Sequence, residues 1–485
     1  MSNHSVPARL SATITPAAMP LHKLEPDAIS VTQDVVIGMA SSAPAASIGL
    51  TLAALAAATA YGSGAIILLT ALPMVVIANA YRRLNLWNAN CGASFEWVGR
   101  AINPYLGFLT GWLMIAAYII ATVSGVEVLG PSVLAVFGAN SASTWADIAI
   151  GTAVGVVMLV IAVAGIKITA RTQVGMAFIE YTLLIGFGIA GLIAVLTHHH
   201  GTVPFSRGWL SISGIGGAGS AASGFLVAVF MFTGWDGTLY VNEEVTNRYR
   251  DPGRAAITAV IVLGVIYTLC TAGLQGSVPA SALQDHSASA LVYTAQAIGG
   301  SGWAKAMAFA LALSVIATTG TGIVLSARIV YGMASRRVLP AFLGNVPARF
   351  ATPVAASVLV GFLIIALTWV YLLATSVQDA FTDVVDVTGL LFAIFYALTA
   401  LATIAYYRRR IFSSPGDAVV LGILPLGAVG FLVWVLVKTL STAPAAQIWS
   451  LVGVIGAGVA VMAAARIFLR PAFFSLPRES DASRH

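Results

Sequence analysis

The chain has 485 residues, of which 59% are hydrophobic and only 9% are charged. A soluble globular domain carries about 25% charged residues, so this composition excludes a soluble protein and indicates an integral membrane protein. The formal net charge of +6 is therefore better explained by membrane topology than by nucleic-acid binding.

Twelve apolar stretches are long enough to cross a membrane, which takes about 20 residues of helix. They cover residues 35–58, 64–81, 106–129, 148–166, 174–196, 222–241, 255–274, 306–330, 353–373, 387–406, 418–437 and 448–465. The sequence thus predicts an all-α integral membrane fold with about twelve transmembrane helices. This transmembrane domain, residues 33–470, lies between an N-terminal tail, 1–32, and a C-terminal tail, 471–485.

Basic residues gather in every second loop of this topology. With the N-terminus inside the cell, the cytoplasmic loops carry most of the arginines, among them Arg82, Arg83, Arg171, Arg248 and Arg336. The external loops carry only Arg207, Lys305 and Lys438. This positive-inside bias predicts a multi-pass protein of the plasma (inner) membrane with both termini in the cytoplasm.

The first span is interrupted by a short segment that contains Ser41, Ser42, Ala43 and Pro44. Because proline lacks an N–H and suits the first turn of a helix, we expect the span to unwind and to restart at Pro44. The freed N–H groups of Ala45, Ala46 and Ser47 would then form a site for an anion such as a substrate carboxylate. The alternative is a plain proline kink that packs against neighbouring helices.

Two features follow in the first half of the chain. Residues 82–97 are too polar to cross the membrane and rich in aromatic side chains, which predicts a short interfacial helix on the cytoplasmic side. Glu180 lies about six residues into the fifth span, roughly 9 Å along the helix from its cytoplasmic end. Burial favours the protonated form of such a carboxyl, so Glu180 is a candidate for proton coupling. The alternative is a glutamate paired with an arginine or a backbone group near the helix end.

The sixth span contains the second interruption, Thr233, Gly234, Trp235, Asp236 and Gly237. A charge at the bilayer centre costs about 2.5–3.5 kcal/mol even on lenient scales, so an acid there is a candidate functional residue. We expect these five residues to bind substrate, with the Trp235 ring covering a bound amine. The alternatives are that Asp236 caps the restarted half-helix or stays protonated.

Polar residues after the sixth span and within the eighth are further candidates. Glu243 and Glu244 face several arginines in the same loop, which makes them candidates for a cytoplasmic gate, although a solvated charged loop would look the same. The hydroxyls of Thr318 and Thr319 could help to hold Na⁺, but threonines in membrane helices more often bond to backbone. No cofactor motif and no metal-spaced set of cysteines and histidines is present in the sequence.

The two interruptions occupy corresponding positions in two units of five spans, residues 33–197 and 219–407, which two extra helices, 418–467, follow. An odd number of spans makes the second unit enter the membrane from the opposite side, so the repeat is inverted. Paired broken helices in such repeats mark the binding site of a secondary transporter.

The residues around the second interruption resemble bacterial amino acid permeases of the amino acid, polyamine and organocation (APC) superfamily. The resemblance rests on residues 230–236, 242–244 and 251–256, with support from 107–112 and 326–334. It implies a five-plus-five inverted-repeat fold, alternating access, and a substrate that is held by residues 41–46 and 233–237. Two positions differ from the family pattern. Glu180 falls where some proton-coupled members place a lysine, and the first break lacks the glycines that many members carry.

The sequence therefore predicts a permease that imports amino acids across the plasma membrane, with the proton as coupling ion. Alternatives are a polyamine or cationic amine transporter or exchanger, and a sodium-coupled amino acid symporter. A diamine would need a second acid, and besides Asp236 the spans offer only Glu180 and Glu127. A membrane enzyme is disfavoured because no histidine falls inside a predicted span.

Overall fold

The computed structural model describes residues 23–480, apart from residues 60–61, 127, 140–142, 198–208, 210, 212–214, 216, 287–288 and 375–376. Glu127 is therefore outside the described residues. Across the described ranges every named element is a helix, and extended chain pairs only in an isolated parallel bridge between Ile29 and Val245. The prediction of an all-α fold is confirmed.

Eleven helices of the described chain are long and apolar enough to cross a membrane, and a bent pair at the start brings the number to twelve. The first span consists of α1 (Val31–Ser41) and α2 (Pro44–Thr59). The remaining spans are built on α3 (Ser63–Trp87), α5 (Pro104–Val126), α7 (Thr144–Ala164), α8 (Ile166–Leu196), α9 (Ala218–Met231), α10 (Asp251–Ser277), α12 (Ala290–Ser335), α13 (Val354–Ala374), α14 (Val377–Tyr406), α16 (Leu424–Leu440) and α17 (Ala445–Ala464).

Shorter elements connect these spans. They are α4 (Ser94–Ala101), α6 (Leu129–Val136), η3 (Trp235–Leu239), η4 (Asn242–Glu244), α11 (Ala280–Asp285), η6 (Ala341–Gly344), η7 (Arg410–Phe412), α15 (Pro415–Asp417), η8 (Ala418–Ile423), η9 (Ala465–Leu469) and η10 (Ala472–Ser475). The helix predicted between the second and third spans is α4, although it begins at Ser94, near the end of the predicted segment, because α3 continues to Trp87.

The eighth span differs from its predicted extent of 306–330. Helix α12 runs from Ala290 to Ser335, and it is bent at Gly299 and Gly300, where Gly300 has a φ of 75°. Glycine adopts this conformation without the strain that a side chain would add. The first residues of α12 therefore form a separate segment, and the span itself follows the bend.

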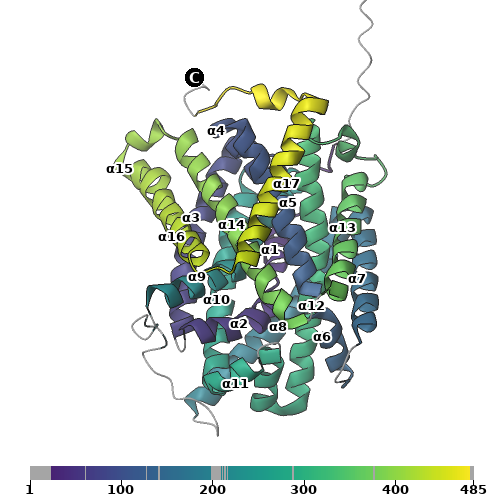
Figure 1. The fold of residues 1–485 in the computed structure, drawn as a ribbon, viewed down its shortest axis with the longest axis vertical. Helices are drawn as coiled ribbons and strands as arrows, with labels where there is room; N and C mark the ends of the chain where they lie inside the picture. The colour runs from purple at the N-terminus through teal and green to yellow at the C-terminus, as the bar shows by residue number, and fades with distance from the viewer. Residues whose placement is uncertain are drawn as a thin grey trace, which may run out of the picture.

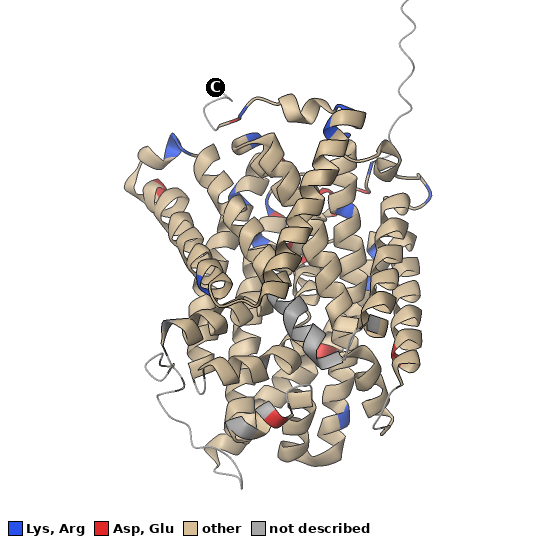
Figure 2. Ribbon diagram, in the orientation of Figure 1, with Lys and Arg blue, Asp and Glu red and all other residues tan. Residues whose placement is uncertain are grey.

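The broken first span lies at the centre of the bundle, whereas α17 packs on α5 and crosses in front of the bundle in this view (Figure 1). Most of α12 is buried among other helices, while α17 exposes apolar side chains such as Trp449 and Val452. Both ends of the described chain lie on the same face of the molecule, which we call the terminal face (Figure 1). Figure 2 shows most lysines and arginines in the half of the molecule next to this face.

Candidate substrate site

The two predicted breaks are present and touch each other. Helix α1 ends at Ser41, α2 begins at Pro44, and Ala43 between them has a φ of 45°. In the sixth span α9 ends at Met231, and Gly234 follows with a φ of 99°. A Cβ on Gly234 would lie only 2.5 Å from the Ser41 carbonyl oxygen, so glycine is required where the breaks meet.

The N-terminus of α2 is already occupied by groups of the protein. The Ala45 N–H donates to Glu180 Oε1 at 2.9 Å, and the Ala46 N–H donates to Ser314 Oγ at 3.3 Å. The N–H of Ser47 donates to Ala43 O at 2.7 Å. The sequence predicted that these three N–H groups form an anion site. In the structure each of them donates a hydrogen bond to another group of the protein.

Glu180 therefore joins the fifth span to the break in the first. Its side chain is fully buried, and within the described residues its second oxygen, Oε2, has no hydrogen-bond partner. The contact with a backbone N–H agrees with the alternative that a backbone group pairs with this glutamate. That N–H belongs to another helix, which the sequence alone could not indicate.

Asp236 is enclosed by tyrosines. Its Oδ1 accepts hydrogen bonds from Tyr118 of α5 at 3.0 Å and from Tyr396 of α14 at 2.7 Å, and its Oδ2 accepts one from Tyr240. Hydrogen bonds from several donors stabilise a buried carboxylate. The neighbouring Trp235 ring stacks on Tyr396 with centroids 5.2 Å apart, and both Trp235 and Asp236 are fully buried.

A small cavity of about 40 Å³ lies beside the first break. The residues that line it come from α2 and the break before it, α5, α9 and α12, and they are Ala43, Ala46, Ser47, Leu50, Ala121, Thr122, Ser124, Gly125, Phe230, Val315 and Thr318. None of these lining residues is charged, and Trp235 and Asp236 are not among them. A space of this size holds a few water molecules, so an amino acid could enter only if the lining moved apart.

The threonines of the eighth span are bonded to backbone. Thr318 Oγ1 lies 2.9 Å from both Ala40 O of the first span and Ser314 O, and Thr319 Oγ1 donates to Val315 O at 2.8 Å. These contacts fit the helix-packing interpretation. Among the described residues, no group of three or more histidine, cysteine, aspartate or glutamate side chains could hold a metal ion.

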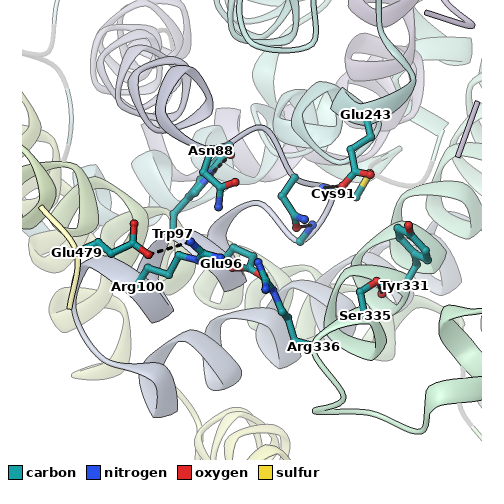
Figure 3. A network of polar contacts seen from close by, with 12 residues as sticks. Asn88, Cys91, Glu96, Trp97, Arg100, Glu243, Tyr331, Ser335, Arg336 and Glu479 are labelled. Atoms are coloured by element: carbon teal, nitrogen blue, oxygen red, sulfur yellow. Dashed lines mark hydrogen bonds and ion pairs between the residues drawn. The ribbon is translucent and has the colours of Figure 1, made fainter. Parts of the chain in front are cut away.

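Charged residues that follow the sixth span bind neighbouring segments. Arg328 of α12 donates to both oxygens of Glu244 at 2.9 and 3.0 Å, and both side chains are fully buried. Glu243 Oε1 accepts the backbone N–H of Cys91 at 3.0 Å (Figure 3). The backbone of Glu244 also accepts the N–H of Ala28 at 2.8 Å. The two glutamates therefore hold the end of the sixth span against other segments.

Several residues of this region carried no signal in the sequence. Tyr118, Tyr240 and Tyr396 look like ordinary packing residues of apolar spans, and their common partner becomes visible only in the fold. Phe230 and Arg328 belong to motifs of the family resemblance, but nothing local indicated that Phe230 lines the cavity or that Arg328 pairs with Glu244.

Two broken helices that meet at the centre of a bundle of two five-helix units define a membrane transporter. The chain belongs to the amino acid permease family, whose family model matches residues 29–467.

Relatives of known function are distant. The branched-chain amino acid permease BcaP of Lactococcus lactis is 25% identical over 297 residues, which cover 58% of this chain and 63% of BcaP. The D-serine/D-alanine/glycine transporter of Escherichia coli is 20% identical over 344 residues, or 69% of this chain and 71% of that protein. The match to BcaP thus spans less than two thirds of its length. These relatives are transporters and not enzymes.

Two solved structures share the fold. A manganese transporter of Eremococcus coleocola superposes with a TM-score of 0.58 at 13% identity, covering 91% of this chain and 95% of that chain. MhsT in complex with L-phenylalanine gives a TM-score of 0.57 at 15% identity, covering 83% of this chain and 98% of MhsT. At such low identity the likeness concerns the fold alone.

Proposed function

We propose that this protein imports amino acids across the plasma membrane by alternating access and that the proton is its coupling ion. The observation that carries this proposal is the hydrogen bond from the Ala45 N–H to the buried Glu180 carboxyl at 2.9 Å. It connects a protonatable group directly to the break of the first span, beside the cavity that Ala46 and Ser47 line.

The coupling follows from the electrostatics of a helix N-terminus. An ionised Glu180 satisfies the partial positive charge at the start of α2 and competes with a substrate carboxylate for it. Protonation removes that negative charge, so the substrate carboxylate can approach the residues from Ser41 to Ala46. When Glu180 releases its proton on the other side of the membrane, its carboxylate again binds the N-terminus of α2. The returned negative charge then favours release of the substrate.

Membership of the amino acid permease family supports an amino acid as substrate. The matched relatives carry the names of permeases for branched-chain amino acids, for D-serine, D-alanine and glycine, and for γ-aminobutyric acid. The uncharged lining of the cavity favours a zwitterion over a diamine, since Asp236 is already bonded to three tyrosines. Residues 233–237 do not line the cavity, so they would reach the substrate only after the lining has moved apart.

Sodium coupling is the second candidate, because Ala40 O, Ser314 and Thr318 bring several oxygens together near the break. We favour the proton for two reasons. Thr318 donates a hydrogen bond directly to Ala40 O, so these two oxygens are not arranged around a cation. Glu180, which can bind a proton, lies at the same break.

We assign the terminal face to the cytoplasm on the basis of its excess of arginine and lysine (Figure 2). Glu243 and Glu244 then belong to the cytoplasmic gate, and Arg328 is the partner that locks it.

Uptake into sodium-free proteoliposomes tests the proposal. A mixture of labelled amino acids is offered with and without an inward proton gradient, and the accumulated compounds are identified chemically. Accumulation that requires the gradient is the expected result. Accumulation that requires sodium instead would replace the proton, and uptake of amines without amino acids would overturn the substrate class.

A further inference from the structure

The C-terminal segment, residues 471–480, packs against the start of the third span. The Phe473 ring stacks on Phe95 of α4 with centroids 4.5 Å apart, and Phe474 stacks on Tyr105 of α5 at 5.0 Å. A Cβ on Gly99 would lie 2.6 Å from Phe473 Cζ, so the absence of a side chain there makes room for the ring. Both phenylalanines are buried.

A polar contact holds the far end of the same segment. The Glu479 N–H donates to the Arg100 carbonyl oxygen at 2.8 Å, and Arg100 Nη1 donates to Glu479 Oε1 at 2.9 Å (Figure 3). Glu479 thus binds both the backbone and the side chain of the last turn of α4. Together the aromatic and polar contacts fasten residues 471–480 along α4.

Helix α4 is tied in turn to the end of the eighth span. Arg100 Nε donates to Glu96 Oε2 at 2.8 Å, and the other oxygen of Glu96 pairs with Arg336 at the C-terminus of α12. Glu96 is fully buried between the two arginines. Alternating charges therefore connect the C-terminal segment to α12 through α4, as Figure 3 shows.

The loop just before α4 lies against α12 and beside Glu243, which follows the sixth span. A Cβ on Gly332 of α12 would lie 2.6 Å from Gly92 Cα, so the loop and α12 are in direct backbone contact. The next residue back, Cys91, is fully buried and donates its N–H to Glu243. If α4 moved away from α12, this loop would move with it and Cys91 would become exposed.

We propose that residues 471–480 act as a strap that holds α4 against α12 and keeps the terminal face closed, and that its release is a step in opening. The proposal rests on alternating access as part of the proposed function. The strap lies beyond residues 29–467, which the family model matches. Phe473, Arg100 and Glu479 are thus positioning residues for the gate, with no contact to the cavity.

The experiment uses Cys91 as the reporter. The sequence contains only two cysteines, Cys91 and Cys270, so Cys270→Ala leaves Cys91 as the single thiol. Inside-out vesicles that contain this full-length variant are treated with a membrane-impermeant maleimide, and the rate of modification is measured. The test variants are Glu479→Gln and Phe473→Ala, and the matched control is Arg478→Gln, which neutralises an exposed charge beside Glu479.

Glu479→Gln should be modified at least about threefold faster than the parent, a shift typical of losing a partly exposed ion pair. Phe473→Ala should also be modified faster, because it removes a buried ring, while Arg478→Gln keeps the parent rate. Equal rates in all four proteins would overturn the strap. Thermal melting and gel filtration show whether each variant is folded, and Glu479→Gln decides alone if Phe473→Ala does not fold.

This readout needs no transported substrate. A failure of the proposed function would appear as absent uptake in the parent protein, whereas a failure of the strap would appear as unchanged labelling.

Discussion

Glu180 Oε1 lies 2.9 Å from the backbone nitrogen of Ala45, which makes the glutamate the acceptor for the first turn of α2. A carboxylate of the protein therefore occupies a position that suits the carboxylate of an amino acid. Since two negative charges cannot share one helix N-terminus without cost, the charge state of Glu180 and the binding of substrate should depend on each other.

Glu180→Gln should abolish accumulation driven by a proton gradient and leave exchange of substrate across the membrane largely intact. The amide keeps the contact with Ala45 but can no longer bind and release a proton. Gradient-driven uptake and counterflow exchange in proteoliposomes measure the two activities separately. Thr182→Ala, on the exposed side of α8, is the control. Undiminished gradient-driven uptake in Glu180→Gln would remove this residue from the coupling mechanism.

Asp236→Asn should destabilise the protein by about 1–3 kcal/mol, because an amide nitrogen then faces tyrosine hydroxyls arranged as donors. Uptake should fall as well, since Asp236 ties the unwound part of the sixth span to α5 and α14. Thermal melting and uptake are measured together. Tyr267→Phe removes another buried hydroxyl that bonds to the sixth span, at Met231 O, and is the control. Unchanged melting of Asp236→Asn would contradict the tyrosine cage.

Gly234→Ala should cost about 1–3 kcal/mol from backbone strain alone, with a clash against Ser41 in addition. We expect a lower melting temperature and loss of uptake. Gly186→Ala on α8 meets no atom within 4 Å and should be neutral or slightly stabilising. If Gly234→Ala melts like the parent protein, then the two breaks are not held as closely as described.

Glu244→Gln should destabilise the closed protein by about 3–5 kcal/mol, because it leaves the charge of Arg328 buried without its partner. Faster labelling of Cys91 from the terminal face should accompany the loss. The control is Glu25→Gln, which breaks the exposed pair with Lys167 and should change little. Equal stability of the two variants would show that the buried pair does not lock the gate.

Cys91 should resist maleimide across the pH range in which an exposed thiol becomes reactive. Burial raises the pKa of the Cys91 thiol, and the nearby Glu243 raises it further. An exposed cysteine has a pKa of about 8.5 and gains thiolate steeply between pH 7 and 8.5, whereas Cys91 stays protonated in this window while the face is closed. A labelling rate in the folded Cys270→Ala protein as fast as in the same protein after denaturation would contradict the burial of Cys91.

The sequence predicted the parts of this architecture that depend on local chemistry. Long apolar runs give the spans, and Pro44 and Gly234 give the breaks, since each acts on its own stretch of backbone. The sequence did not predict contacts between distant residues. Glu180 and Ala45 are 135 positions apart, and Arg328 and Glu244 are 84 positions apart. The tyrosines around Asp236 lack any distinctive sequence pattern. In the sequence Phe473 and Phe474 look like part of a simple tail, and only the fold shows that the Phe473 ring packs against Gly99.

The docked C-terminus also has a practical consequence for handling the protein. An affinity tag or fluorescent fusion attached close behind Glu479 would strain the contact between Glu479 and Arg100. Turnover measured with such a fusion would then report a protein with a loosened gate. A tag at the N-terminus leaves the contact between Glu479 and Arg100 intact and is the better choice for kinetic work.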